Sequence, residues 1–149
     1  MRAERDLWPA PPSPAAAHLA AGVPLHELGD PVPSESLMEL RIPDPAVEPG
    51  KIACEVLDLN RFGNVQLNVR GSHLEEARLE RLDQLSVESV SGAAVARRVI
   101  TYADLKAGEW GVMVDPRGWL SIIRGNPGNA ADGLGVASGD VVWLAESRD

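Results

Sequence analysis

From about residue 51 onward, apolar and polar residues alternate in short segments that glycine or aspartate separates. Residues 64–69 alternate with a period of two, which is typical of a strand with one buried face. Further apolar, β-prone segments occupy residues 52–57, 85–90, 95–101, 110–114, 119–123 and 141–144. Six or seven short strands with turn signals between them predict an all-β domain, a Greek-key barrel or a sandwich.

A short helix is predicted after the strand at 64–69. Ser72 and Glu75 have the spacing of a capping box. The apolar residues that follow have roughly helical spacing, namely Leu74, Ala77, Leu82 and Leu85.

The first 48 residues follow a different pattern. Residues 8–14 are rich in proline and predict extended chain, because proline removes donors and restricts its neighbours. Residues 15–21 predict a short helix, with Ser13 as N-cap, Pro14 as its first residue and Gly22 as its stop. The stretches 29–33 and 43–50 are linker-like. We therefore interpret residues 1–48 as an arm or the end of another domain, and 49–149 as the β domain.

Composition and charge narrow the classes of partner. The chain has 149 residues, 44% hydrophobic residues and a net charge of −8, which fits one acidic globular domain. The negative charge argues against a nucleic-acid backbone or an anionic membrane surface as partner. The sequence has no apolar run of membrane-spanning length and no signal-peptide pattern at its start, which predicts a soluble, cytoplasmic protein.

Residues that could do covalent or metal chemistry are sparse. The single cysteine, Cys54, lies in an apolar stretch and is interpreted as a buried, inert thiol. His18, His26 and His73 lie far apart, and the sequence has no histidine metal pair, nucleophile elbow or phosphate-binding loop. The sequence alone therefore predicts no catalytic residues and no metal site.

Two clusters could recognise a planar heterocycle. In the first, the ring would stack on Phe62 while the amides of Asn60 and Asn64 read its edge; the alternative is a simple turn with Phe62 as a core residue. In the second, Tyr102 is a candidate stacking wall, or else a core tyrosine with Asp104 capping the turn.

A third cluster runs from residue 115 to residue 131. Arg117 and Arg124 are candidates for binding a carboxylate, or else pair with surface carboxylates of this acidic chain. Asn129 and Ala130 can open a short helix whose free N–H groups bind a ligand acceptor atom.

In this order, the clusters resemble the C-terminal domain of the S-adenosylmethionine hydroxide adenosyltransferases, a family that includes the S-adenosylmethionine-dependent fluorinase and chlorinase. The resemblance rests on Arg61-Phe62-Gly63-Asn64, Thr101-Tyr102-Ala103-Asp104, Asn126-x-Gly128-Asn129-Ala130-Ala131 and Gly139-Asp140, and it spans about residues 50–145. Residues 15–29 look like the inter-domain stretch of the family.

The resemblance implies a closed β-barrel of about seven strands in a homotrimer, with the ligand between the N-terminal domain of one subunit and the C-terminal domain of the next. It implies S-adenosylmethionine or adenosine as ligand, bound as substrate without a separate cofactor. By the same resemblance, Phe62 and Tyr102 flank the adenine, Asn64 reads its edge, and Asn126 with Asn129 and Ala130 closes that pocket. Arg117 and Arg124 would lie nearer the methionine end, Arg124 by likeness to the halogenase branch.

Two positions depart from the family pattern, and one half of the family architecture has no counterpart. Asn60 stands where the family has an acidic residue that holds the methionine amino group, which predicts binding weaker by about 1–2 kcal/mol. Pro116 replaces a serine. No segment resembles the catalytic N-terminal domain, so the resemblance predicts a truncated member that keeps the adenine-binding face and is inactive alone. The alternatives are a PDZ-like peptide binder, suggested by residues 129–142, and a pure trimerisation module.

Overall fold

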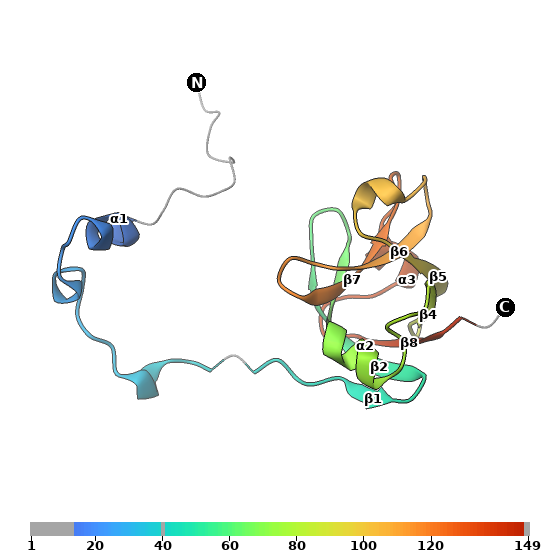
Figure 1. The fold of residues 1–149 in the computed structure, drawn as a ribbon, viewed down its shortest axis with the longest axis horizontal. Coiled ribbons are helices and arrows are strands. Elements are labelled where there is room, and N and C mark those ends of the chain that lie inside the picture. Colours follow the sequence, from blue (N-terminus) through green and yellow to red (C-terminus); the bar gives the residue numbers. More distant parts are fainter. Residues whose placement is uncertain (1–13, 40, 148–149) are drawn as a thin grey trace, which may run out of the picture. The chain divides into compact units, whose positions relative to one another are not determined.

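The computed structural model describes residues 14–39 and 41–147, and the chain divides into two compact units, 1–40 and 41–149 (Figure 1). The described part of the first unit holds α1 (Pro14–Ala20) and two 3-10 turns, η1 (Leu25–Glu27) and η2 (Ser34–Ser36), and none of them buries a residue. The predicted helix is present and begins at Pro14. The predicted N-cap, Ser13, lies outside the described residues.

The described residues of the second unit form a closed barrel of seven strands. These are β2 (Lys51–Leu59), β3 (Val65–Arg70), β4 (Gln84–Glu88), β5 (Ala93–Arg98), β6 (Trp110–Val114), β7 (Trp119–Arg124) and β8 (Val141–Glu146). Their order is β2-β3-β7-β6-β5-β4-β8, and β8 pairs back onto β2 to close the sheet. The pair β5–β6 is parallel and the others are antiparallel, so the predicted all-β barrel is confirmed as a mixed one.

A short strand extends the barrel unit toward the N-terminus. β1 (Ala46–Glu48) pairs antiparallel with the start of β2, with Glu48 opposite Lys51. Pro49 and Gly50 form the turn between them, and Gly50 has the positive φ that the third position of a type II turn requires. The prediction that 43–50 is only a linker is therefore wrong for 46–48, because a proline–glycine pair marks a hairpin turn as well as a linker. The predicted boundary at 48 falls inside this hairpin.

Period-two alternation places the core as predicted. On β3, Val65, Leu67 and Val69 are fully buried, and the adjacent β2 buries Ile52, Cys54 and Val56. The Cys54 Sγ donates to the carbonyl oxygen of Val142 over 3.1 Å. Burial raises the pKa of this thiol to about 12, because the thiolate would lose its hydration. The interpretation of Cys54 as a buried thiol is confirmed.

The helix after β3 is shorter than its apolar spacing suggests. α2 (Gly71–Glu76) begins directly after Arg70, whose backbone N–H donates to the His73 Nδ1 over 3.1 Å, so the predicted Ser72 cap is wrong. The chain leaves the helix at Arg78, which has a φ of +61°. Leu85 belongs to β4, where it is buried by strand alternation and not by a helical face.

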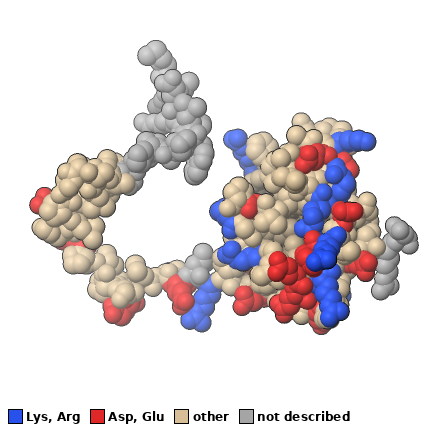
Figure 2. Space-filling view, viewed as in Figure 1, with Lys and Arg blue, Asp and Glu red and all other residues tan. Residues whose placement is uncertain are grey.

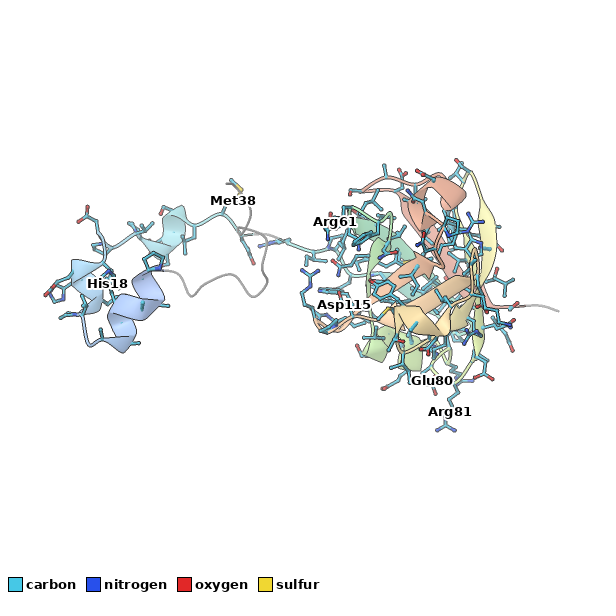
Figure 3. All side chains as sticks on the ribbon, turned by 90° about the horizontal axis from the view of Figure 1, so that it is seen from above. His18, Met38, Arg61, Glu80, Arg81 and Asp115 are labelled. Carbon is cyan, nitrogen blue, oxygen red and sulfur yellow. The ribbon has the colours of Figure 1, made fainter. Side chains whose placement is uncertain are left out.

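Charged side chains lie on the surface of the barrel unit. Acidic and basic groups are intermixed over the face shown in Figure 2. The ion pair of Arg81 with Glu80 is solvent-exposed at its arginine end, and the Arg81 side chain points away from the barrel (Figure 3). Among the described residues, no helix combines the length and the apolar character that a bilayer crossing needs.

Candidate functional site

A cavity of about 680 Å³ opens at the end of the barrel where β2 and β7 finish and β3 begins. The described residues that line it are Asn60, Phe62, Asn64, Tyr102, Leu105, Arg124, Gly125, Asn126 and Gly128. They come from the β2–β3 loop, from the β5–β6 loop with its 3-10 turn η3 (Tyr102–Asp104), and from the last residue of β7 with the loop that follows it. Segments far apart in the chain thus meet around one space.

The β2–β3 loop is shaped by the Asn60 side chain. Its Oδ1 accepts the backbone N–H of Phe62 over 2.9 Å and that of Asn64 over 3.1 Å. This is the local bonding by which asparagine fixes a turn. The predicted turn is therefore present, but Phe62 is no core residue, because 63% of it is exposed. The turn presents the ring at the cavity.

A glycine lets this loop dock on the helix α3 (Ala130–Leu134). Gly63 has a φ of +75°, and a Cβ atom there would overlap the Asn129 side chain. The Gly63 carbonyl oxygen accepts the N–H of Ala131 over 2.9 Å, and the Asn129 Oδ1 caps the helix by accepting the N–H of Asp132 over 3.0 Å. The close approach fixes the cavity wall that carries Phe62.

Tyr102 contributes a second aromatic ring to the lining. Its hydroxyl oxygen accepts a hydrogen bond from the Asn64 Nδ2 over 3.2 Å. The ring is 56% exposed, whereas Asn64 is only 9% exposed. Tyr102 is therefore a wall of the cavity and not a core tyrosine, and its bond with Asn64 ties two loops together across 38 positions of sequence.

An ionic network holds the loop that carries Tyr102. Arg97 on β5 pairs with Glu109 over 3.1 Å and also donates to the backbone oxygen of Asp104 over 2.5 Å. The Asp104 carboxylate accepts the N–H groups of Ile100 and Thr101, which is the predicted capping role. These two N–H bonds lower the pKa of Asp104. The hydrogen bond from Arg97 lowers the pKa of Glu109, with the Lys106 N–H adding to it.

Arg124 ends β7 at the rim of the cavity. Its guanidinium lies over the Trp110 ring, 4.9 Å from the centroid, and its Nε donates to the Gly108 carbonyl oxygen over 3.2 Å. Such stacking orients an arginine while leaving donors for a ligand. The alternative of surface pairing with a carboxylate fits Arg117 and not Arg124.

The structure brings six of the nine predicted ligand residues to the cavity lining: Asn60, Phe62, Asn64, Tyr102, Arg124 and Asn126. Arg117 is not among them. It lies in the β6–β7 turn at the opposite end of β7, 75% exposed and 3.7 Å from Asp115. Asn129 and Ala130 lie behind the wall, where Asn129 is the helix cap and Ala130 is fully buried. The N–H groups of Ala131 and Asp132 are taken within the protein.

Sequence reasoning missed Leu105 in the lining and Trp110 beneath Arg124. Leu105 follows Tyr102 by three positions, but its direction depends on how the ionic network folds the loop. Gly125 and Gly128 lie within the third sequence cluster, residues 115–131, although neither is predicted there as a ligand residue. A Cβ atom at Gly125 would overlap the backbone of Lys106, so the glycine at this position permits contact between the two loops.

The lining is suited to binding a flat, neutral ring with polar edges. Two aromatic rings, three amide side chains and a leucine surround the cavity, and its charged lining group is Arg124. In the part of the chain that the structure describes, no three histidine, cysteine or carboxylate side chains are grouped to hold a metal ion. Amides supply both donors and acceptors to a heterocycle edge, and rings supply stacking surface.

Comparison with known proteins gives consistent matches. Residues 54–143 match the profile of the SAM hydroxide adenosyltransferase C-terminal domain. The (R)-S-adenosyl-L-methionine hydrolase of Salinispora tropica is 41% identical over 136 residues, which are 91% of this chain and 47% of the relative. The corresponding hydrolase of Salinispora arenicola is 39% identical over 138 residues, with the same coverage. The chain thus spans about half the length of these curated relatives.

Solved structures agree with the fold. An uncharacterized conserved protein from Thermotoga maritima superposes with a TM-score of 0.69 at 30% identity, over 88% of this chain and 49% of that one. A conserved hypothetical protein from Thermus thermophilus gives a TM-score of 0.53 at the same identity and coverage.

Proposed function

Because this chain belongs to the SAM hydroxide adenosyltransferase family, matching its C-terminal domain over residues 54–143, we propose that its cavity binds the adenine of an adenosyl ligand. The ligand class is S-adenosylmethionine or adenosine. The family match gives no support to the alternative of a PDZ-like peptide binder.

One observation carries this proposal: the hydrogen bond from Asn64 to Tyr102 beside two exposed aromatic rings. Because the Asn64 Nδ2 is engaged by the tyrosine hydroxyl, its Oδ1 is the atom left to accept from a ligand. Adenine carries an exocyclic amino group that donates and a π-face that stacks. Phe62 and Tyr102 supply the faces, and Asn64 supplies the acceptor.

Equilibrium binding to adenosine and inosine tests this assignment. Inosine has a carbonyl oxygen where adenosine has the amino group, so it would set two acceptors against each other at Asn64. We expect calorimetry on the full chain to show adenosine binding and inosine at least about tenfold weaker, which corresponds to one lost polar contact. Equal affinity for the two nucleosides, or no binding of adenosine at millimolar concentration, would reject the assignment.

The chemistry at the ribose C5′ is a separate question. In a complete member, water or halide attacks C5′ and methionine leaves, and catalysis rests on positioning and desolvating that nucleophile. The described lining offers amides, rings and a guanidinium, so we propose that this chain binds the adenosyl group and that the activating groups come from outside it. Incubating the chain with S-adenosylmethionine should then release methionine no faster than buffer does. Release at the rate of the Salinispora tropica hydrolase in a parallel assay would contradict this.

Assembly is the second part of the proposal. Two of the loops that form the cavity expose apolar side chains, Phe62 on the β2–β3 loop and Tyr102 and Ile100 on the β5–β6 loop, and Ile100 is 87% exposed. A partner that covers the ligand would bury them. We therefore propose a homotrimer, the assembly that the family resemblance implies. Light scattering checks it: a trimer mass supports it, and a strict monomer at all concentrations contradicts it.

A further inference from the structure

We propose that this cavity selects adenosyl ligands that lack the sulfonium charge, and so binds adenosine and the thioether S-adenosylhomocysteine more tightly than S-adenosylmethionine. The inference rests on the proposed function and goes beyond it by assigning the charge of the preferred ligand. It follows from which charged and polar atoms the fold directs at the cavity.

The first observation is the sign of the charge around the site. Arg124 lines the cavity, and the Arg61 guanidinium lies 4.8 Å from the centroid of the Phe62 ring that forms one wall. Among the described lining residues there is no carboxylate. A further cation brought beside these two arginines is repelled, and the low dielectric of a partly enclosed site strengthens that repulsion.

The nearest carboxylates on the cavity loops are already engaged. Asp104 accepts two backbone N–H groups, and Glu109 is paired with Arg97 and accepts the Lys106 N–H. Arg97 holds the loop through the Glu109 carboxylate and through the backbone oxygen of Asp104. Both carboxylates hold the loop in place, and neither lines the cavity.

The second observation is the orientation of the Asn60 amide. Its Oδ1 accepts the N–H groups of Phe62 and Asn64, so the hydrogen-bond network fixes which end of the amide is oxygen. What Asn60 has left for a ligand is its Nδ2, a donor. A donor attracts carboxylate, hydroxyl or ring-nitrogen acceptors and gives no stabilisation to a sulfonium, the one charge by which S-adenosylmethionine differs from S-adenosylhomocysteine.

S-adenosylmethionine and S-adenosylhomocysteine form a matched pair for the test, because they differ by one methyl group and one positive charge. Calorimetry on the full chain at low salt should give S-adenosylmethionine a dissociation constant about five- to tenfold above that of S-adenosylhomocysteine, the effect of roughly one near-surface charge contact. Adenosine should bind about as tightly as the thioether, because both are held through the adenine.

Three substitutions identify the cause. Asn60→Asp keeps an oxygen for the turn and adds a carboxylate. It should therefore abolish or reverse the difference in dissociation constant between S-adenosylmethionine and S-adenosylhomocysteine. Arg124→Gln removes one positive charge from the lining and should reduce that difference in dissociation constant. Ser72→Asp is the control, because it adds the same charge on α2, at the far end of β3 and roughly 20 Å away by strand length. It should leave the ratio of the two dissociation constants unchanged. Thermal melts of each variant confirm folding.

The outcomes separate this inference from the function beneath it. If adenosine binds but S-adenosylmethionine binds at least as tightly as its thioether, the inference is overturned and the proposed function stands. If S-adenosylmethionine binds more weakly than its thioether but Asn60→Asp does not change the difference, the charge around the cavity is not its cause and the inference is overturned. If adenosine does not bind at all, the proposed function and this inference are both rejected.

Discussion

Asn64 and Tyr102, 38 positions apart in sequence, share a hydrogen bond of 3.2 Å from the asparagine Nδ2 to the tyrosine hydroxyl. The bond joins the end of the β2–β3 loop to the 3-10 turn η3, and with the Nδ2 at the hydroxyl the Asn64 Oδ1 is left to accept from a ligand. A binding surface that neither loop could hold alone therefore depends on their contact.

Breaking this contact should weaken nucleoside binding. Asn64→Ala removes the edge acceptor and the tyrosine's partner, and we expect adenosine affinity to fall by about 1–2 kcal/mol. Tyr102→Phe keeps the ring and should cost less. A double-mutant cycle by calorimetry should show a coupling of about 0.5–1.5 kcal/mol. Additive effects of the two substitutions would show that the pair does not act together on the ligand.

The docking of the β2–β3 loop on α3 should be sensitive to one methyl group. Gly63→Ala places a Cβ atom on the Asn129 side chain, which then gives up its cap on Asp132. Gly50→Ala is the matched control, because Gly50 also has positive φ but has no atom within 4 Å of the added Cβ. Both should lose about 1 kcal/mol to backbone strain, and Gly63→Ala about 1 kcal/mol more. Equal urea midpoints for the two variants would contradict the docking.

The stability of the Tyr102 loop should fall in acid. Asp104 and Glu109 both have lowered pKa values in the folded chain, so the unfolded chain binds more protons and stability rises with pH. Their contribution is present above about pH 4.5, the ordinary pKa of a glutamate side chain, and is lost as pH falls through the lowered values.

Urea titrations between pH 3 and pH 7 measure this directly. The difference in unfolding free energy between the native chain and Glu109→Gln should shrink toward zero below pH 4.5. Glu76→Gln, at the exposed end of α2, serves as the control for the removal of one carboxylate outside this network. A constant difference for Glu109→Gln would mean that the Arg97 pair contributes nothing to folding.

Cys54 should report on global unfolding. Because its pKa is about 12 and it is buried, its reaction with a disulfide reagent at pH 8 should be on the order of a thousandfold slower than in urea. The chain has one cysteine, so the absorbance change counts a single site. Rapid reaction of the folded chain at the unfolded rate would contradict the packing of β2 against β8.

The sequence predicted the barrel because strand alternation and turn residues are local signals. Val65, Leu67 and Val69 bury one face of β3 as their period of two requires. The sequence did not predict β1, because Pro49 and Gly50 are as typical of a linker as of a hairpin turn. Only the pairing of β1 with β2 distinguishes the two.

The candidate site was predictable in part for the same reason. The Asn60 turn and the Asp104 cap follow from residue type within a few positions. Arg117 was assigned to the site with Arg124, but the two stand at opposite ends of β7, and which end faces a ligand is a property of the closed barrel. Leu105 lies in the cavity lining and Trp110 lies against Arg124 because of loop packing, which no local sequence pattern specifies.

A crystal structure of the full chain grown with adenosine tests the adenine site most directly. The purine should lie between the Phe62 and Tyr102 rings, with its amino group within hydrogen-bond distance of the Asn64 Oδ1. Density for adenosine elsewhere, for example in the smaller cavity of about 200 Å³ beside β1 and Trp143, with the first cavity left unfilled, would contradict the assignment.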